Sequence, residues 1–326
     1  MVSQQNSTNI NWYPGHMAKT KRQIIEDLKI IDVVIELLDA RIPISSQNPN
    51  IAEITKGKKK IIILNKCDIA DEKENQKWIN FFKKKGIEAI LTDANSGKGI
   101  EQISKTVEKL MKEEQEKQAE KGRTGRKIKV MILGIPNVGK SSLINRIAKK
   151  TSAGVGNKPG VTKQKQWIRI NEKIELLDTP GVLWPKFENE EVALHLAFTG
   201  TIKEEILDKV EIAYQLTKHL IENEKEKLCE RYKLDINKID EILNQTDRPE
   251  NENLYEIMLE IGRKRGCIMS GGNIDEEKTS RILLDEFKNG KIGKITLEKC
   301  ERKGWTMRML NFVNDRDTPF CSQTYE

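Results

Sequence analysis

The segment Gly134-Ile-Pro-Asn-Val-Gly139-Lys140-Ser141 has the residue types and spacing of a phosphate-binding loop. In such a loop, backbone N–H groups at the start of a helix surround nucleotide phosphates, and the two glycines keep a Cβ out of the way. We expect Lys140 to reach the β- and γ-phosphates and the Ser141 hydroxyl to bind Mg²⁺. An apolar run precedes the loop and a helical pattern follows from Ser142, which is the context that this motif requires.

A second motif, Asp178-Thr-Pro-Gly181, also follows an apolar run. Open α/β sheets bind ligands at the carboxyl edge of their strands, where this motif is expected to lie. Asp178 is expected to hold Mg²⁺ through water, and the Gly181 N–H to contact the γ-phosphate. Thr162 lies in a glycine-rich stretch between the two motifs and is the natural switch residue, closing on the metal when the γ-phosphate is present. Thr151 is the alternative.

The segment Asn65-Lys66-Cys67-Asp68 lies upstream of the phosphate loop, directly after the apolar run 60–64. At this position Asp68 would accept hydrogen bonds from N1–H and the amino group of guanine, and would reject adenine, which lacks that amino donor. Asn95 and Ser96 follow the next apolar run as a second guanine-contacting loop. The nucleotide is therefore expected to be GTP. Ordinary GTPases carry the phosphate loop first, so this order predicts a circularly permuted domain.

The residues expected to contact GTP are drawn from all of these motifs. They are Asn65, Lys66, Asp68, Asn95, Ser96, Gly134, Asn137, Val138, Gly139, Lys140, Ser141, Ser142 and Gly181. Catalytic roles are expected for Lys140 and Thr162, and the expected Mg²⁺ ligands are Ser141, Thr162 and Asp178.

These motifs require an α/β scaffold, and short apolar runs that alternate with helical patterns predict a doubly wound, mostly parallel sheet. The expected strands are 32–39, 60–64, 87–91, 128–133, 166–170 and 173–177. The polar stretch near 112–127 is typical of a linker or a solvated helix end. After Glu191 helical periodicity takes over, with a capping box at Thr201–Glu204 and a second helix capped by Asp275.

The predicted fold class is thus α/β, a circularly permuted P-loop GTPase domain followed by a small all-α domain. We place the G domain at 1–187, the helical domain at 188–298 and a tail of unknown role at 299–326.

The composition bears on partners and location. A net charge of +7 favours an anionic partner, nucleic acid before a membrane surface, although a lysine-rich surface without such a role is an equal interpretation. The 5 cysteines show neither close pairing nor metal-ligand spacing, as in a reducing compartment. The polar N-terminus precedes no apolar signal segment, and no apolar run approaches the roughly 20 residues of a membrane helix. We therefore expect a cytoplasmic protein with no membrane contact, and we also expect it to be monomeric.

The order of these motifs resembles that of the circularly permuted GTPases. Three further segments resemble the bacterial ribosome biogenesis GTPase A family: Trp12-Tyr-Pro-Gly-His-Met17-Ala-Lys, Asp39-Ala-Arg-Ile-Pro43 and Gly266-Cys-Ile-Met-Ser-Gly-Gly272. The resemblance covers about residues 10–298, and 300–326 has no match to the family pattern. It implies GTP hydrolysis with Mg²⁺, coupled to late assembly of the large ribosomal subunit, with the helical domain contacting ribosomal RNA. The alternatives are a GTP-gated RNA-binding protein with little hydrolysis, or a GTPase of tRNA modification.

The resemblance also assigns roles to single residues. Val182 stands where classical GTPases often place a water-orienting Gln, and an apolar side chain cannot bind the attacking water. The family's suggested substitute is His16, which could instead pack or cap near the N-terminus. Asn137 resembles a potassium ligand of potassium-stimulated GTPases, with bracing of the loop as the alternative.

Three further features are open to two interpretations. Asp39 and Arg41 follow a strand and could form a structural ion pair or contact a ligand. The cationic run 263–265 could contact RNA phosphates or remain on the solvated surface. His195 and His219 lie in helical sequence and are expected to be surface or core residues.

Overall fold

The computed structural model describes residues 15–123, 125–152, 166–179, 189–202 and 208–301. Its strands form one sheet in the order β3-β2-β1-β4-β6-β5, parallel except for β5, which pairs antiparallel with β6. The strands are β1 (Val33–Asp39), β2 (Lys59–Asn65), β3 (Glu88–Leu91), β4 (Ile128–Gly134), β5 (Gln166–Arg169) and β6 (Ile174–Asp178). The predicted mostly parallel sheet is confirmed, with each strand close to its expected position.

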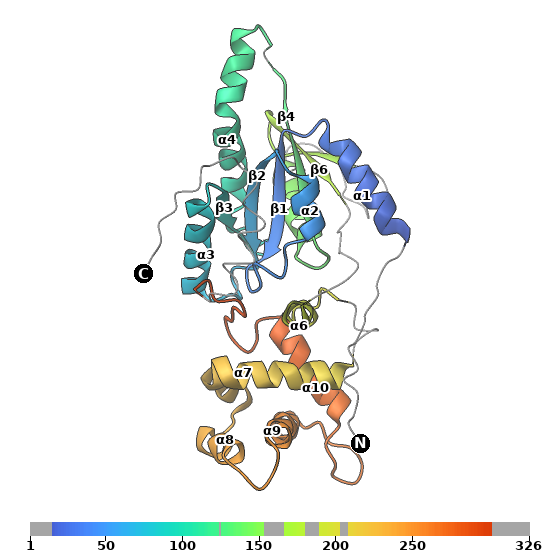
Figure 1. The fold of residues 1–326 in the computed structure, drawn as a ribbon, viewed down its shortest axis with the longest axis vertical. Coiled ribbons are helices and arrows are strands. Elements are labelled where there is room, and N and C mark those ends of the chain that lie inside the picture. The colour runs from blue at the N-terminus through green and yellow to red at the C-terminus, as the bar shows by residue number, and fades with distance from the viewer. Residues whose placement is uncertain (1–14, 124, 153–165, 180–188, 203–207, 302–326) are drawn as a thin grey trace, which may run out of the picture.

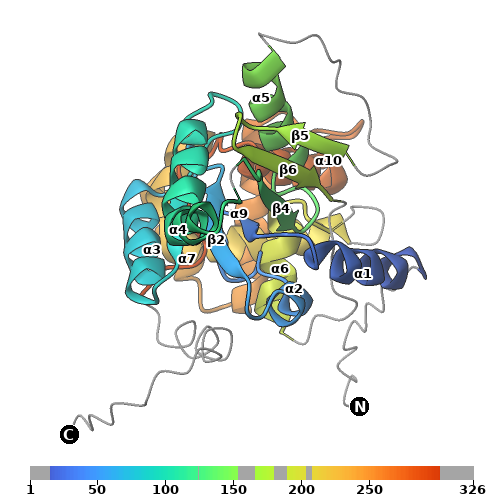
Figure 2. The same cartoon turned by 90° about the horizontal axis from the view of Figure 1, so that it is seen from above.

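Helices cover both faces of this sheet (Figures 1 and 2). They are α1 (Gly15–Leu28), α2 (Pro49–Ile54), α3 (Glu72–Lys84), α4 (Ile100–Glu120) and α5 (Lys140–Ser152). Apolar residues of α1 and α2 pack on one face, and those of α3, α4 and α5 on the other. Because both faces are covered, all of β1 is buried, which explains its uninterrupted apolar run. Of the polar stretch near 112–127, the part up to Glu120 is a helix end.

The remaining helices form a separate layer next to the carboxyl edge of the sheet (Figure 1). They are α6 (Glu190–Phe198), α7 (Lys209–Tyr232), α8 (Ile236–Leu243), α9 (Glu250–Lys264) and α10 (Glu276–Lys288). The predicted helix start at Asp275 is confirmed, because its side chain accepts a hydrogen bond from the Lys278 N–H. The first long helix differs from the prediction: α7 begins at Lys209 with Asp208 as its N-cap. The predicted capping box extends into 203–207, outside the described residues.

The chain beyond α10 returns to the sheet and fastens the two layers together. The Ile295 N–H donates to the Ile69 carbonyl, and the Trp78 indole N–H donates to the Glu298 carbonyl at 2.9 Å. The fully buried Glu298 carboxylate accepts from the Ile44 N–H at 2.5 Å and lies 3.1 Å from His195 Nδ1. His195 is thus a core residue, as expected. The sheet and the helices share polar contacts at this boundary.

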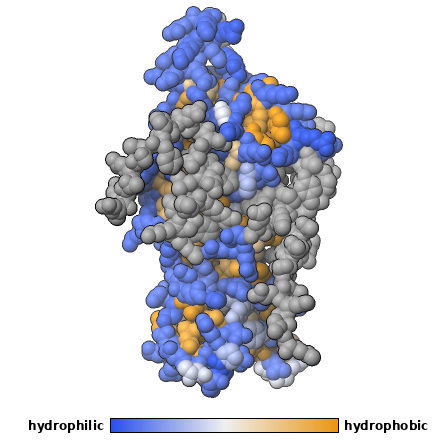
Figure 3. Space-filling model, viewed as in Figure 1, coloured by the Kyte–Doolittle hydropathy of each residue, from blue (hydrophilic) through white to orange (hydrophobic). Residues whose placement is uncertain are grey.

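The surface visible in Figure 3 is mainly hydrophilic, with an apolar area over α1. Ile25 and Ile30 are 43% and 47% exposed in this region. Within the described ranges, no helix has both the length and the apolar character needed to cross a membrane.

Candidate nucleotide-binding site

The phosphate loop connects the end of β4 to the start of α5, as predicted. A Cβ on Gly134 would lie 2.8 Å from the Leu37 carbonyl oxygen, so only glycine fits between the adjacent strands. Gly139 has φ +91°, a left-handed conformation that other residues rarely adopt. Val138 is buried, whereas Ser141 and Ser142 are exposed on the first turn of α5. Local geometry therefore accounts for both glycines of the motif.

Asn65 joins the guanine motif to the phosphate loop. Its side-chain Nδ2 donates to the Val138 carbonyl at 2.8 Å. Its Oδ1 accepts from the Thr92 hydroxyl at 3.1 Å and from the Ala94 N–H at 3.2 Å. Because Asn65 is 98% buried and its bonds reach both the phosphate loop and the loop after β3, one side chain fixes these two loops relative to its own. Two motifs far apart in the chain thus belong to one site.

Lys140 and Asp178 lie together at the phosphate end of this site. Lys140 Nζ is 3.9 Å from Asp178 Oδ1. Burial lowers the pKa of Lys140 to about 8, against the opposing charge of Asp178. Hydroxyl and carboxylate oxygens are the ligands that Mg²⁺ prefers, and Ser141 and Asp178 offer one of each at adjoining element ends. The residues present therefore fit a nucleotide-bound Mg²⁺.

The second guanine loop is shaped by two residues that the sequence prediction missed. The Asp93 carboxylate accepts from the Asn95 N–H at 2.8 Å and from the Ser96 N–H at 3.1 Å. Burial raises the pKa of Asp93, but these hydrogen bonds and the charge of Arg146 lower it more, so the net shift is downward. Arg146 on α5 donates to the Ser96 carbonyl at 2.5 Å. An Asp two residues before a turn was the available signal for Asp93, whereas Arg146 carried none.

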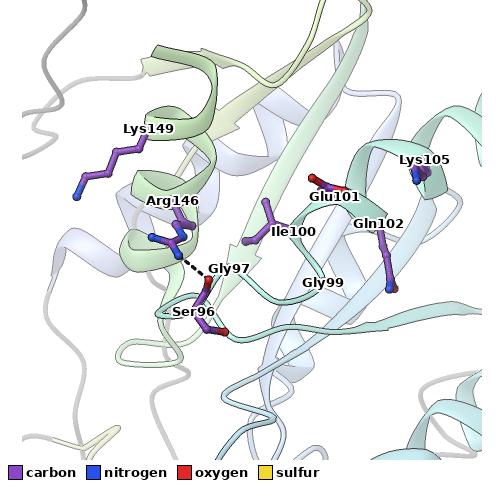
Figure 4. Close-up of a pocket in the computed structure, with 9 residues that line it drawn as sticks. All are labelled: Ser96, Gly97, Gly99, Ile100, Glu101, Gln102, Lys105, Arg146 and Lys149. Atoms are coloured by element: carbon purple, nitrogen blue, oxygen red, sulfur yellow. Dashed lines mark hydrogen bonds between the residues drawn. The ribbon is translucent and has the colours of Figure 1, made fainter. Parts of the chain in front are cut away.

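A cavity of about 700 Å³ lies beside this loop, between α4 and α5 (Figure 4). Lys105, Arg146 and Lys149 line it together with Ser96 and Glu101. Cations therefore predominate beside the guanine loop, in addition to Lys140 at the phosphate end.

The guanine motif itself ends in an accessible carboxylate. Asp68 is exposed, whereas its neighbour Cys67 is buried and donates its N–H to the Thr92 carbonyl. The Ile69 N–H donates to the Lys66 carbonyl, so Asp68 lies in a turn that starts at Lys66. This geometry presents Asp68 toward solvent at the carboxyl edge of the sheet.

The other predicted site residues differ in how much of them the structure describes. Thr162, Gly181 and Val182 lie outside the described residues, and of His16 only its backbone position in α1 is described. The Asn137 amide donates to the Gly200 carbonyl at 2.6 Å and thereby joins the phosphate loop to the helical layer.

The structure also shows the partners of the cationic run 263–265 and of the pair Asp39 and Arg41. Arg263 is paired with Glu256 and Glu260, and Arg265 with Glu286. These contacts favour a structural role for both arginines over RNA contact. Asp39 and Arg41 form a buried ion pair at 2.8 Å.

The chain is similar to known proteins over most of its length. Residues 129–266 match the family described as 50S ribosome-binding GTPase. Ribosome biogenesis GTPase A of Bacillus cereus is 47% identical, over 90% of this chain and 95% of the relative. The Bacillus pumilus protein of the same name is 45% identical, over 90% of this chain and 99% of the relative. A crystal structure of GNP-bound YlqF from T. maritima superposes with a TM-score of 0.56 at 28% identity, covering 87% of this chain and 99% of that one.

The sheet topology, the phosphate loop and a guanine motif placed ahead of it define a circularly permuted P-loop GTPase. The chain binds guanine nucleotide and hydrolyses GTP. It belongs to the ribosome biogenesis GTPase A family. The family resemblance drawn from the sequence is therefore confirmed.

Proposed function

We propose that this chain is a GTPase that binds a precursor of the large ribosomal subunit during its late assembly and contacts its ribosomal RNA. The observation that carries the GTPase part is the side chain of Asn65, which belongs to the first guanine motif and bonds the phosphate loop and the second guanine loop. The printed names of the relatives support a ribosomal partner, and the net charge of +7 suits an RNA surface.

Residue roles follow from the site geometry and the motif pattern. Asp68 reads guanine, and the loop at Asn95 and Ser96 closes against the base. The phosphate loop binds the phosphates with Lys140, while Ser141 and Asp178 hold Mg²⁺, which neutralises charge on the phosphates when it is bound.

The remaining assignments rest on the sequence motifs. Thr162 would contact the metal, and Gly181 would contact the γ-phosphate. His16 would position the attacking water, because the apolar side chain of Val182 cannot bind it.

The Asn137 oxygen is proposed as a potassium ligand, in addition to the bond that its nitrogen makes to Gly200. Stimulation of turnover by K⁺ but not by Na⁺ in wild type, lost in Asn137→Ala, supports that ligand. Equal rates in the two salts contradict it.

The helical part is proposed as the RNA-binding domain, with the G domain at 1–187, the helical domain at 188–298 and a tail at 299–326. The protein is proposed to act as a monomer in the cytoplasm. Since Arg263 and Arg265 are paired with glutamates, RNA contact there would fall to exposed Lys264 and the exposed loop at Ile268 and Met269.

Cosedimentation with ribosomal particles tests the proposal. Purified protein is mixed with large-subunit precursors in three parallel samples, which contain a non-hydrolysable GTP analogue, GDP or no nucleotide. We expect the strongest binding with the analogue. Equal binding in all three samples contradicts coupling between the nucleotide and the particle, and absence of binding in all of them contradicts the ribosomal partner.

A further inference from the structure

Asp39 lies next to the guanine motif at the carboxyl end of β1. It is paired with Asn65 in the parallel register of β1 and β2. Its Oδ2 lies 2.9 Å from Lys66 Nζ, and its side chain is 2% exposed. The same carboxylate accepts from the Arg41 guanidinium at 2.8 Å and 3.0 Å. One buried carboxylate therefore holds two cations, one of which belongs to the guanine motif.

Lys66 starts the turn that presents Asp68. It has φ +60°, a left-handed conformation that is uncommon for a residue with a side chain. Its carbonyl accepts the Ile69 N–H, which closes the turn around Asp68. Such a conformation persists where the surrounding contacts determine it, and the bond to Asp39 is one of those contacts. The position of Asp68 thus depends on how firmly Lys66 is held.

Arg41 extends this network to the helical layer. Its Nη1 donates to the carbonyls of Phe287 and Lys288 at 3.3 Å and 3.2 Å, and its guanidinium lies 5.6 Å from the Phe287 ring centre. These are the last two residues of α10, which ends near the carboxyl edge of the sheet (Figure 1). A helix C-terminus carries partial negative charge, so Asp39 and α10 both attract the same guanidinium.

The two cations beside Asp39 keep its carboxylate charged. Burial alone would raise the pKa of Asp39, but the charges of Arg41 and Lys66 and their hydrogen bonds hold it well below its usual range. The carboxylate is therefore ionised at neutral pH. Its Oδ2 is shared between Arg41 and Lys66, so a change in one contact alters the other.

We propose that Asp39 is a positioning residue for guanine recognition, holding Lys66 in the turn that presents Asp68, and that Arg41 makes this hold depend on the docking of α10. The inference rests on the proposed role of Asn65–Asp68 in binding guanine. It gives the helical layer a direct connection to the base end of the site, separate from the phosphate end.

The test is a double-mutant cycle on GDP affinity, measured with a fluorescent GDP analogue on the full chain. We expect Asp39→Asn to weaken binding about tenfold, the scale of one charge-assisted hydrogen bond. Lys66→Met should weaken binding as well, and Asp39→Asn should add little to it. Asp32→Asn is the matched control, because Asp32 also pairs with an arginine, Arg126, at the opposite end of the same strand. It should bind GDP like wild type.

The outcomes separate this inference from the proposed site. If Lys66→Met and Asp68→Ala both bind GDP like wild type, the guanine site itself is misplaced. If Lys66→Met is impaired but Asp39→Asn is not, only the positioning role of Asp39 fails. Fully additive losses in the double variant also contradict it, because Asp39 would then act independently of Lys66.

Hydrogen exchange tests the connection between α10 and the guanine motif even if Asp39→Asn does not fold. In wild type, GDP should slow amide exchange at 289–291, whose N–H groups bond to carbonyls in the last turn of α10. Arg41→Lys keeps a cation beside Asp39 but loses the forked geometry, so the GDP-dependent slowing should be reduced severalfold. No GDP effect on these amides in wild type contradicts the connection.

Discussion

Replacing Asn65 with Asp changes a single group in the site and nearly preserves its shape. The new side chain can still accept from Thr92 and Ala94, but an oxygen replaces the Nδ2 that lies 2.8 Å from the Val138 carbonyl oxygen. A hydrogen bond is lost and a buried carbonyl is left unpaired, which costs about 1–3 kcal/mol. The phosphate loop can relax when empty but must be in place to bind phosphate. GDP affinity should therefore fall about 5-fold to 150-fold.

The assay is titration with a fluorescent GDP analogue, together with the unfolding midpoint of the nucleotide-free protein. Asn253→Asp is the matched control, since the buried Asn253 donates its amide to the Gln245 carbonyl at 2.9 Å within the helical layer. The control should lose stability but keep GDP affinity. If Asn65→Asp binds GDP within twofold of wild type, Asn65 does not couple the two motifs and the reasoning is refuted.

Two other predictions address charge. The pKa of Lys140 is about 8 without nucleotide, so about half of its side chains are uncharged at pH 8. Because phosphates favour the charged form, GDP binding at pH 8 should take up about half a proton at this residue. At pH 6.5 Lys140 is already charged, so the uptake should fall toward zero. Calorimetry in buffers of different ionisation enthalpy measures this uptake, and Lys140→Met corrects for other groups; the same uptake in that variant contradicts the assignment. Glu298→Ala should destabilise the protein by about 3–5 kcal/mol, because the Ile44 and Ser45 N–H groups would remain buried and unpaired. Urea unfolding measures the change, with exposed Glu301→Ala expected to alter it by less than about 1 kcal/mol.

Much of the G domain could be predicted because its signals are local. Buried parallel strands give continuous apolar runs, and the phosphate loop and the Asp275 cap have short sequence patterns with direct physical causes. The permuted order could be predicted because the guanine motif comes at the end of β2, which is one of these apolar strands. These features depend on residues that are close in sequence.

The features that were missed depend on contacts between distant residues. Arg146 reaches Ser96 across 50 positions, and Arg41 reaches Phe287 across 246. The sequence left Asp39 and Arg41 open between an ion pair and a binding contact, since only the folded chain brings Lys66 beside them. The sequence left the run 263–265 open between RNA contact and a solvated surface, since Glu286, the partner of Arg265, is placed by tertiary packing.

The central claim is that Asn65–Asp68 reads guanine in the same site where the phosphate loop binds phosphates. Turnover of GTP, ATP and XTP by wild type and Asp68→Asn tests it most directly, in the presence of large-subunit precursors. Wild type should strongly prefer GTP, because the Asp68 carboxylate pairs with the guanine N1–H and amino group. Asp68→Asn should shift the preference to XTP, because xanthine replaces that amino group with a carbonyl that an amide can donate to. Equal turnover of ATP and GTP by wild type, or an unchanged preference for GTP in Asp68→Asn, would contradict the account.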